Sequence, residues 1–251
     1  MNFFITGVSR GFGKELALHY LSLGHKVFGF SRSILDDKNK TDKTLLDSED
    51  FYYFKGSVNN DTDVDNAIIV AMKFLGKIDV LINNAAYKSY KFPVEITNEE
   101  FKDSIQTNLT SPILLCQKLL PVFLKQNRGH IINISSNAGM TNYQKGTAYR
   151  CPKAGLISYT LSLAKYLKGT NISANVVSPP TFSTDDYKNN FPEINHRKLL
   201  QSDKVIKILD YIVFNKKFIS GKNFPMFRFK TLVKYALTKN LEFIEYLFQP
   251  K

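Results

Sequence analysis

Cysteine, histidine and long apolar runs are all scarce in this sequence of 251 residues. The two cysteines, Cys116 and Cys151, lack the spacing of a metal site, and a reducing compartment would keep them as free thiols. The four histidines show no grouping of metal ligands. We therefore expect neither a disulfide-stabilised fold nor a metal centre.

The apolar runs are too short for a membrane protein. No stretch of about 18 uninterrupted apolar residues occurs, so the sequence predicts no membrane-spanning helix. An apolar strand is expected directly after Met1 and Asn2, which leaves no room for the basic segment that begins a secretory signal. We therefore expect a cytoplasmic protein.

Composition favours one domain and an anionic partner. Hydrophobic residues make up 43% of the sequence and charged residues 22%, which suits one large α/β domain with a substantial core. The net charge of +12 favours a phosphate-bearing cofactor, a phosphorylated substrate, nucleic acid or an anionic membrane surface. Residues 204–251 contain 10 Lys and Arg and 3 Asp and Glu, so 10 minus 3, or +7, of the excess lies there. Net charge alone does not choose among these partners.

Apolar runs of strand length alternate with longer amphipathic stretches. The predicted strands are 3–6, 26–31, 51–54, 80–83, 130–134, 173–177 and 217–219. The predicted helices are 12–23, 62–75, 97–126, 149–168, 203–214 and 229–247. This alternation predicts an α/β protein with a doubly wound parallel sheet. We expect residues 181–200 to form a substrate loop, because loops after the carboxyl ends of strands line ligand crevices.

A glycine-rich turn follows the first predicted strand and precedes a helix. Gly7, Gly11 and Gly13 permit a tight turn whose N–H groups approach a pyrophosphate, and the helix N-terminus favours the negative charge. Alternatively, the glycines only end a strand and start a helix. A nucleoside-triphosphate P-loop is disfavoured, because Glu15 stands where a magnesium-binding hydroxyl is required.

This turn resembles that of a known family. The segment Thr6-Gly7-Val8-Ser9-Arg10-Gly11-Phe12-Gly13 is similar to the TGxxxGxG turn of short-chain dehydrogenases/reductases. The resemblance implies that Arg10 and Arg32 contact the 2′-phosphate of NADP(H). An NAD site would favour an acid near Arg32, and none occurs before Asp36. The alternative is that both arginines are solvated surface charges.

The pattern Tyr-x-x-x-Lys occurs three times, with tyrosines at 87, 149 and 235, whereas chance placement gives roughly one and a half. Its context selects the middle copy. Tyr149 begins a predicted helix and follows Ser136 by thirteen residues. Residues i and i+4 share a helix face, so Lys153 reaches the same pocket as the Tyr149 hydroxyl.

These residue types suit proton transfer during carbonyl reduction. A phenol with a pKa of about 10 is a weak base near neutrality, but the ammonium of Lys153 favours the phenolate and tunes it for proton exchange. Tyr149 would protonate the alkoxide that forms as NADPH gives hydride, and Ser136 would orient the oxygen. The resemblance further implies that Asn108 supports a water-linked proton relay to the lysine.

Two further segments match the family pattern, Asn83-Asn84-Ala85-Ala86 and the segment from Asn175 to Pro179. Together with the motifs above they occur in the order found in the family and cover roughly residues 3–184. The resemblance implies a Rossmann-like single domain at 1–227, with a C-terminal amphipathic helical extension of the same domain at 228–251. The expected catalytic residues are Asn108, Ser136, Tyr149 and Lys153. The expected cofactor-binding residues are Thr6, Gly7, Ser9, Arg10, Gly11, Phe12, Gly13, Arg32, Asn84, Ala85, Lys153, Pro179 and Thr181.

Several positions depart from the family pattern. Ala86 and Pro180 stand where the family has glycine, and Ser57 replaces an aspartate that contacts adenine. Pro152 suits its predicted helix only within the first turn. These departures support an alternative function, a dinucleotide-sensing binding protein with little catalysis.

The expected partners are a small-molecule carbonyl or alcohol, for which the basic charge balance favours an anionic compound, and a second copy of the chain in a homodimer or homotetramer. Specific nucleic-acid binding is not expected, because no recognisable motif for it occurs. Membrane association is likewise disfavoured, since Glu242 and Glu245 interrupt the basic character of the C-terminal stretch.

Overall fold

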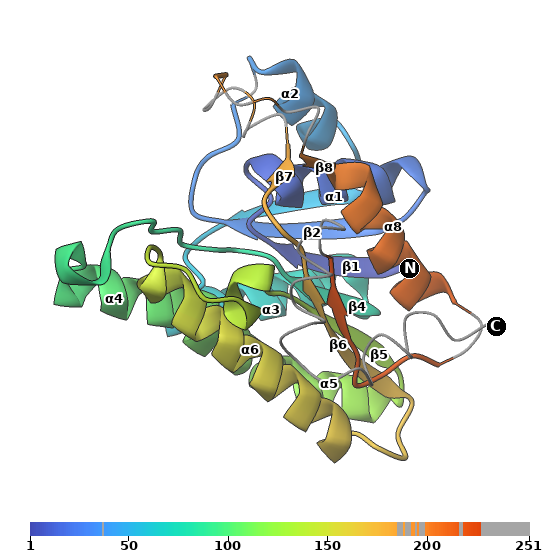
Figure 1. The fold of residues 1–251 in the computed structure, drawn as a ribbon. Helices are drawn as coiled ribbons and strands as arrows, with labels where there is room; N and C mark the ends of the chain where they lie inside the picture. Colours follow the sequence, from blue (N-terminus) through green and yellow to red (C-terminus); the bar gives the residue numbers. More distant parts are fainter. Residues whose placement is uncertain are drawn as a thin grey trace.

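The computed structural model describes residues 1–36, 38–184, 188, 192–193, 195, 199–215 and 218–226. Within them, parallel strands form one seven-stranded sheet in the order β3-β2-β1-β4-β5-β6-β9 (Figure 1). The strands are β1 (Asn2–Thr6), β2 (Lys26–Ser31), β3 (Phe51–Lys55), β4 (Val80–Asn83), β5 (Gly129–Ile134), β6 (Ile172–Ser178) and β9 (Asn223–Pro225).

Helices cover both faces of this sheet. On one face lie α1 (Gly11–Ser22), α2 (Lys40–Leu46) and α8 (Ser202–Phe214), and on the other lie α3 (Asp61–Leu75), α5 (Ser111–Gln126) and α6 (Thr147–Tyr166). Each layer has its own core, one containing Leu16 and Leu209, the other Leu119 and Leu163. The doubly wound Rossmann-like fold is therefore confirmed.

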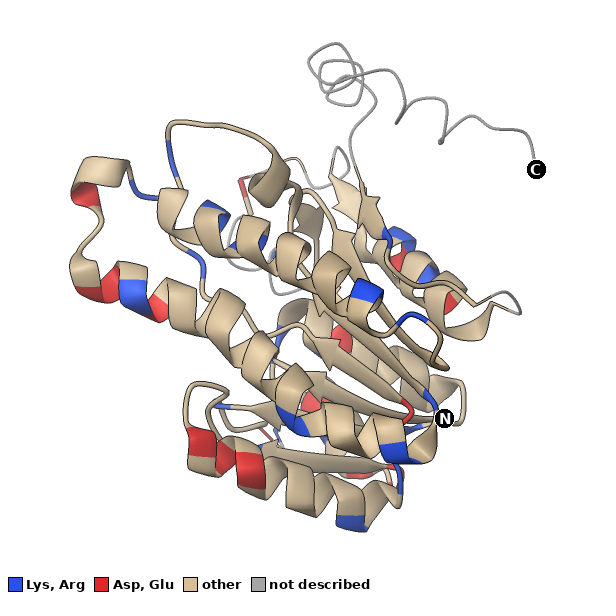
Figure 2. Ribbon diagram, turned by 90° about the horizontal axis from the view of Figure 1, so that it is seen from below, with Lys and Arg blue, Asp and Glu red and all other residues tan. Residues whose placement is uncertain are grey.

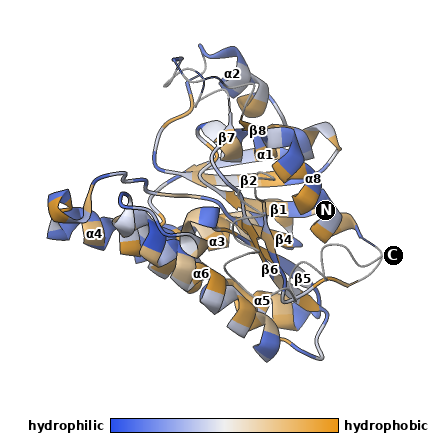
Figure 3. Cartoon of the chain, in the orientation of Figure 1, coloured by the Kyte–Doolittle hydropathy of each residue, from blue (hydrophilic) through white to orange (hydrophobic). Residues whose placement is uncertain are grey.

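The strands could be predicted from the sequence because the sheet is buried on both faces. Every residue of β4 and β6 is buried, and parallel strands covered on both sides consist of nearly continuous apolar runs. Figure 3 shows the hydrophobic residues concentrated in the strands and on the inner sides of the helices.

The seventh strand was predicted at the wrong place. Residues 218–219 are not in a strand, and the chain joins the sheet only at β9. Asn175 of β6 holds the approaching chain, because its Nδ2 donates to Ile219 O at 2.8 Å and its Oδ1 accepts from Lys222 N at 3.1 Å. Gly221 turns the backbone between them with φ of 72°. Strand pairing therefore begins after this side-chain clamp.

The helix predicted at 97–126 is divided. It consists of α4 (Asn98–Ile105), a π-helical segment η2 (Gln106–Thr110) and α5. The Ser111 N–H bonds to Gln106 O, five residues earlier, in place of the usual four. Such π segments often occur at functional sites, and this one contains Asn108.

Two loop regions have local order that the sequence did not reveal. Residues 33–50 contain α2, whose N-cap Asn39 accepts from the N–H groups of Thr41 and Asp42. The expected substrate loop begins with β7 (Phe182–Ser183), which pairs with β8 (Leu200–Gln201). The helical extension expected at 228–251 lies outside the described residues.

Lys and Arg positions occur on several helices and loops of the described residues, and Asp and Glu positions are found on some of the same helices (Figure 2). None of the helices in the described ranges combines the length and apolarity needed to cross a bilayer.

A chain of buried polar side chains joins the sheet to α6. Asn83 Nδ2 donates to Asn133 Oδ1 at 2.8 Å, and Asn133 Nδ2 donates to Thr160 Oγ1 at 2.8 Å. Asn133 and Thr160 are fully buried, so water does not replace a lost partner without entering the core.

We expect Asn133→Ala to lower the free energy of unfolding by roughly 2–4 kcal/mol, because Asn83 and Thr160 would each lose a buried partner. Urea denaturation measures this loss. The exposed Asn142→Ala is the matched control and should leave stability nearly unchanged. Equal stability of both variants with the wild type would contradict the importance of this polar chain.

Candidate active site

The glycine-rich turn lies at the carboxyl end of β1, where neighbouring connections leave the sheet in opposite directions. Gly7 has φ of 76°, and its N–H donates to Phe30 O at 2.8 Å. A Cβ on Gly13 would lie 2.1 Å from Gly7 O, so any larger residue at position 13 would push the helix away from the turn. Doubly wound sheets bind ligands at this topological switch point.

The beginning of α1 suits a phosphate group. The N-cap Arg10 makes no side-chain cap hydrogen bond, and the first turn contains no acidic residue. Neither the N-cap side chain nor an acidic residue of the first turn therefore occupies these N–H groups, which suits the binding of an anion. Phe12 is a core residue, because its ring packs 4.9 Å from that of Phe182, so only its backbone is suited to cofactor binding.

Thr6 ties the turn to the strand on the other side of the switch point. Its buried Oγ1 accepts from Asn84 N at 2.9 Å and from Ala85 N at 3.0 Å. Asn84 returns a bond from Nδ2 to Thr6 O at 2.9 Å. The structure thus brings together three predicted cofactor-binding residues from segments far apart in the sequence.

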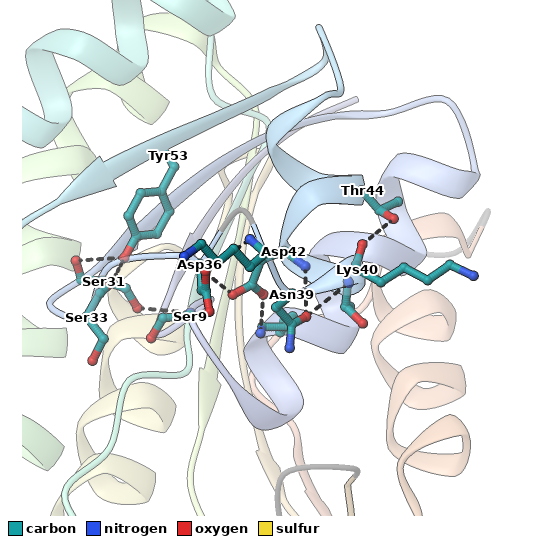
Figure 4. Close-up of polar contacts among 12 residues, drawn as sticks. Ser9, Ser31, Ser33, Asp36, Asn39, Lys40, Asp42, Thr44 and Tyr53 are labelled. Carbon is teal, nitrogen blue, oxygen red and sulfur yellow. Dashed lines mark hydrogen bonds and ion pairs between the residues drawn. The ribbon is translucent and has the colours of Figure 1, made fainter.

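A second group of polar contacts fixes the end of β2 (Figure 4). Ser9 N donates to Ser31 Oγ at 3.2 Å, and the Tyr53 hydroxyl donates to Ser31 O at 3.3 Å. The turn containing Arg10 is therefore linked to the strand end that precedes Arg32, and both arginines are exposed.

The acidic side chains near this end are held by other groups. Asp42 of α2 is buried, pairs with Lys14 of α1, and accepts from Asp36 N at 2.9 Å. Asp36 in turn accepts from Lys38 N at 3.0 Å. No local pattern predicts the Lys14–Asp42 pair, because the two residues come from separate helices.

The predicted catalytic side chains converge on the carboxyl end of β5. Ser136 follows this strand, and its hydroxyl donates to Pro179 O at 3.3 Å and accepts from Ala138 N at 3.1 Å. Lys153 is 2% exposed and lies on α6, with Nζ 5.7 Å from the centre of the Tyr149 ring.

The pKa shifts of Tyr149 and Lys153 differ from those expected for a charged lysine beside a phenolate. Burial raises the pKa of Tyr149 well above its ordinary value, and a hydrogen bond with Ser136 only partly opposes this. Burial, aided by the charge of Lys88, lowers the pKa of Lys153 to about 7. Lys153 Nζ donates to Ile134 O at 2.7 Å. The phenol therefore keeps its proton at neutral pH.

Asn108 anchors the loop that follows β4. Its Nδ2 donates to Tyr87 O at 2.8 Å and to Ser104 Oγ at 2.9 Å, while its Oδ1 accepts from Tyr87 N at 3.2 Å. Both amide hydrogens are thus committed. The same loop contains Lys88, whose charge helps to lower the pKa of Lys153, and Tyr90, whose ionised form would help to raise the pKa of Tyr149. Sequence reasoning missed both residues.

Pro152 does not lie in the first turn of its helix, where a proline is expected to be tolerated. Helix α6 begins at Thr147, so Pro152 lies beyond the first turn. Proline has no N–H, which leaves Ala148 O without its usual intrahelical donor. The Ser104 hydroxyl donates to that oxygen at 2.8 Å instead.

The remaining predicted cofactor residues lie beside Ser136. Pro179 O also accepts from Asn137 N at 3.0 Å, and Thr181 is exposed directly before β7. The carboxyl ends of β1, β4, β5 and β6 therefore carry one continuous set of functional groups. A parallel sheet with this strand order and a glycine-rich turn at its switch point defines the Rossmann-type class of dinucleotide-binding folds.

Comparisons with known proteins agree. The family model described as short chain dehydrogenase matches residues 2–195. The short-chain dehydrogenase/reductase olcF of Penicillium canescens is 31% identical over 215 residues, which cover 84% of this chain and 80% of the fungal protein. A 3-oxoacyl-[acyl-carrier-protein] reductase of Synechocystis sp. is 31% identical over 198 residues, 78% of each chain. The chain therefore belongs to the short-chain dehydrogenase/reductase family of oxidoreductases.

Solved structures support the same fold. ElxO with NADP bound superimposes with a TM-score of 0.80 at 24% identity, covering 89% of this chain and 96% of that one. The 4-hydroxyisoleucine dehydrogenase complexed with NADH gives a TM-score of 0.74 at 20% identity, covering 90% and 96%. Because one of these proteins contains NADP and the other NADH, their likeness does not distinguish the two cofactors.

The lowered pKa of Lys153 predicts a pH-dependent stability difference. Folding lowers this pKa from 10.5 to about 7, so between these values the unfolded chain binds a proton that the folded protein has released. Wild-type stability therefore gains from this residue as pH rises through that range. Lys153→Met removes the buried amine, so its advantage in melting temperature should be largest below about pH 7 and shrink towards about pH 10.

Differential scanning fluorimetry of both proteins across this range measures the effect. The exposed Lys168→Met serves as the matched control and should show no such trend. A difference for Lys153→Met that does not vary with pH would refute the lowered pKa.

Proposed function

We propose that this protein is an NADP(H)-dependent oxidoreductase that interconverts a carbonyl and an alcohol, with Tyr149 as the proton-transfer residue. One observation supports the proposal most strongly. Ser136, Tyr149 and the buried Lys153 lie close together at the carboxyl end of the sheet, where the glycine-rich turn also lies. A structural role alone does not require an amine as buried as that of Lys153, since burying a cation is costly.

The residues at the switch point fit a dinucleotide. The first turn of α1, with its uncapped N–H groups, would hold the pyrophosphate. The exposed Arg10 and Arg32 would bind the 2′-phosphate. Asn84, Ala85, Lys153, Pro179 and Thr181 would complete the site. The bound cofactor supplies or accepts the hydride.

In the direction of carbonyl reduction, these protonation states allow Tyr149 to act as the acid. Tyr149 keeps its proton at neutral pH and can donate it to the oxygen of a carbonyl that accepts hydride. The Ser136 hydroxyl would hydrogen-bond the same oxygen and orient it. Lys153, with a pKa of about 7, both binds and releases a proton near neutrality and would restore the proton of Tyr149. Asn108 would keep the loop at 87–90 in place beside this relay.

The substrate is proposed by class only. The relative from Synechocystis is named a 3-oxoacyl-[acyl-carrier-protein] reductase, which supports a small carbonyl compound, and the net charge of +12 favours an anionic one. Acetoacetyl-coenzyme A is therefore the first compound to test in a screen of carbonyls. We further propose a cytoplasmic homodimer or homotetramer, as in the expectation from sequence.

We expect Tyr149→Phe to bind NADPH as the wild type does but to lose roughly 10²- to 10⁴-fold in turnover, since phenylalanine keeps the ring and lacks the proton. Single-turnover oxidation of NADPH by acetoacetyl-coenzyme A, or by the best carbonyl of the screen, measures this step. Tyr166→Phe, at an exposed position of the same helix, is the control.

Two outcomes would count against the proposal. Near-normal hydride transfer in Tyr149→Phe would exclude that residue as the proton donor. Tight NADPH binding by the wild type, without turnover of any carbonyl or alcohol, would favour the dinucleotide-sensing alternative.

We expect Arg32→Ala to weaken NADPH binding about tenfold while leaving NADH binding nearly unchanged, because only NADPH has the 2′-phosphate. Fluorescence titration with both reduced cofactors at one ionic strength measures this difference. Lys168→Ala controls for the loss of one positive charge. Tighter binding of NADH than NADPH by the wild type would overturn the NADP(H) assignment.

A further inference from the structure

The helix that carries Tyr149 and Lys153 has a defect between them. Pro152 lies inside α6 and has no N–H to donate to Ala148 O, four residues earlier. Ala148 is fully buried, so water is not at hand to bond this carbonyl. A buried carbonyl without a donor is costly, and a donor must come from elsewhere in the fold.

Ser104, in the last turn of α4, supplies that donor. Its side chain is fully buried, and Oγ lies 2.8 Å from Ala148 O. A carbonyl oxygen only accepts hydrogen bonds, so the single hydroxyl hydrogen of Ser104 is committed to Ala148. The lone pairs of Oγ then remain as acceptors.

One of those lone pairs fixes the orientation of Asn108. Asn108 Nδ2 lies 2.9 Å from Ser104 Oγ, which can act only as the acceptor in this contact. The second amide hydrogen bonds to Tyr87 O, and the amide oxygen therefore faces Tyr87 N. The direction of these hydrogen bonds follows from Ala148 O and Tyr87 O, which can only accept, and from Tyr87 N, which can only donate.

We propose that Ser104 is a positioning residue that couples the catalytic helix α6 to Asn108. It replaces the hydrogen bond that Pro152 removes, and through the same hydroxyl it orients the Asn108 amide that holds the loop after β4. The catalytic part of this inference rests on the proposed function, whereas the hydrogen-bonding part concerns stability alone.

A double-mutant cycle tests the hydrogen-bonding part without cofactor or substrate. Ser104→Ala should lower the melting temperature by roughly 3–8 °C, because Ala148 O and Asn108 Nδ2 each lose a buried partner. Pro152→Ala provides an N–H at the correct helical position. In the double variant this N–H bonds Ala148 O, so a large part of the lost stability should return.

Pro121 provides the matched control, because it also lies inside a helix, α5, but is exposed and takes no part in the hydrogen bonds of Ser104. Pro121→Ala should change stability by a similar amount in the wild type and in Ser104→Ala. The rescue must be specific to Pro152. Equal rescue by both proline replacements, or no loss in Ser104→Ala, would overturn the proposed bond.

Turnover separates positioning from simple stabilisation. The Ser104→Ala, Pro152→Ala double variant regains the bond to Ala148 O but not the acceptor for Asn108. We expect its kcat for NADPH-dependent reduction of acetoacetyl-coenzyme A, or of the best carbonyl of the screen, to stay about tenfold low, with KM changed less than twofold. The folded Ser104→Thr variant keeps the hydroxyl, so its kcat should be close to that of the wild type.

The possible outcomes distinguish the two proposals. Full recovery of kcat together with stability in the double variant would show that Ser104 is only structural, which would overturn its positioning role. If the wild type turns over no carbonyl or alcohol, the proposed function fails and the catalytic role falls with it. A specific Ser104–Pro152 coupling in melting temperature would still establish the hydrogen bond.

Discussion

The hydroxyl of Thr6 is the contact on which the arrangement of this site depends. A hydroxyl oxygen accepts two hydrogen bonds, and here it takes the N–H groups of Asn84 and Ala85, just where the strand order reverses between β1 and β4. The glycine-rich turn and the loop after β4 are thereby fixed relative to one buried atom. The turn would receive the pyrophosphate, and the loop leads through Tyr87 to Asn108, so both depend on this contact.

The charge state of the site follows from burial more than from pairing. The sequence suggested that the Lys153 ammonium lowers the pKa of Tyr149, but the structure places Lys153 Nζ on Ile134 O, and burial raises the pKa of the phenol. Burial lowers the pKa of Lys153 to about 7 at the same time. A protonated phenol beside an amine that exchanges its proton near neutrality suits the donation of protons to a substrate.

Sequence reasoning succeeded where the physical signal is local and failed where it is not. Strands β1 to β6 consist of apolar runs because both sheet faces are covered, so they could be predicted. The role of Tyr149, chosen among three candidates by its helix and its distance from Ser136, stays a prediction. The position of β9 depends on a clamp by Asn175, and the pairing of Lys14 with Asp42 joins two helices. Neither contact has a local signature. Ser104 was missed for the same reason, although Pro152, which creates the need for it, had been noticed.

The same hydrogen-bonding device occurs twice along α6. Ser104 Oγ donates to Ala148 O and accepts from Asn108, while Thr160 Oγ1 donates to Leu156 O at 2.6 Å and accepts from Asn133. Between them, Ser135 Oγ donates to Lys153 O at 2.8 Å. In each case a buried hydroxyl donates to a carbonyl of α6, from another segment of the chain for Ser104 and Ser135 and from within the helix for Thr160, and two of the three hydroxyls also accept from an asparagine amide. A helix that must present a tyrosine and a lysine on one face, despite an internal proline, is thus held by side chains at the carbonyl of Ala148, which lost its donor, and at two later carbonyls.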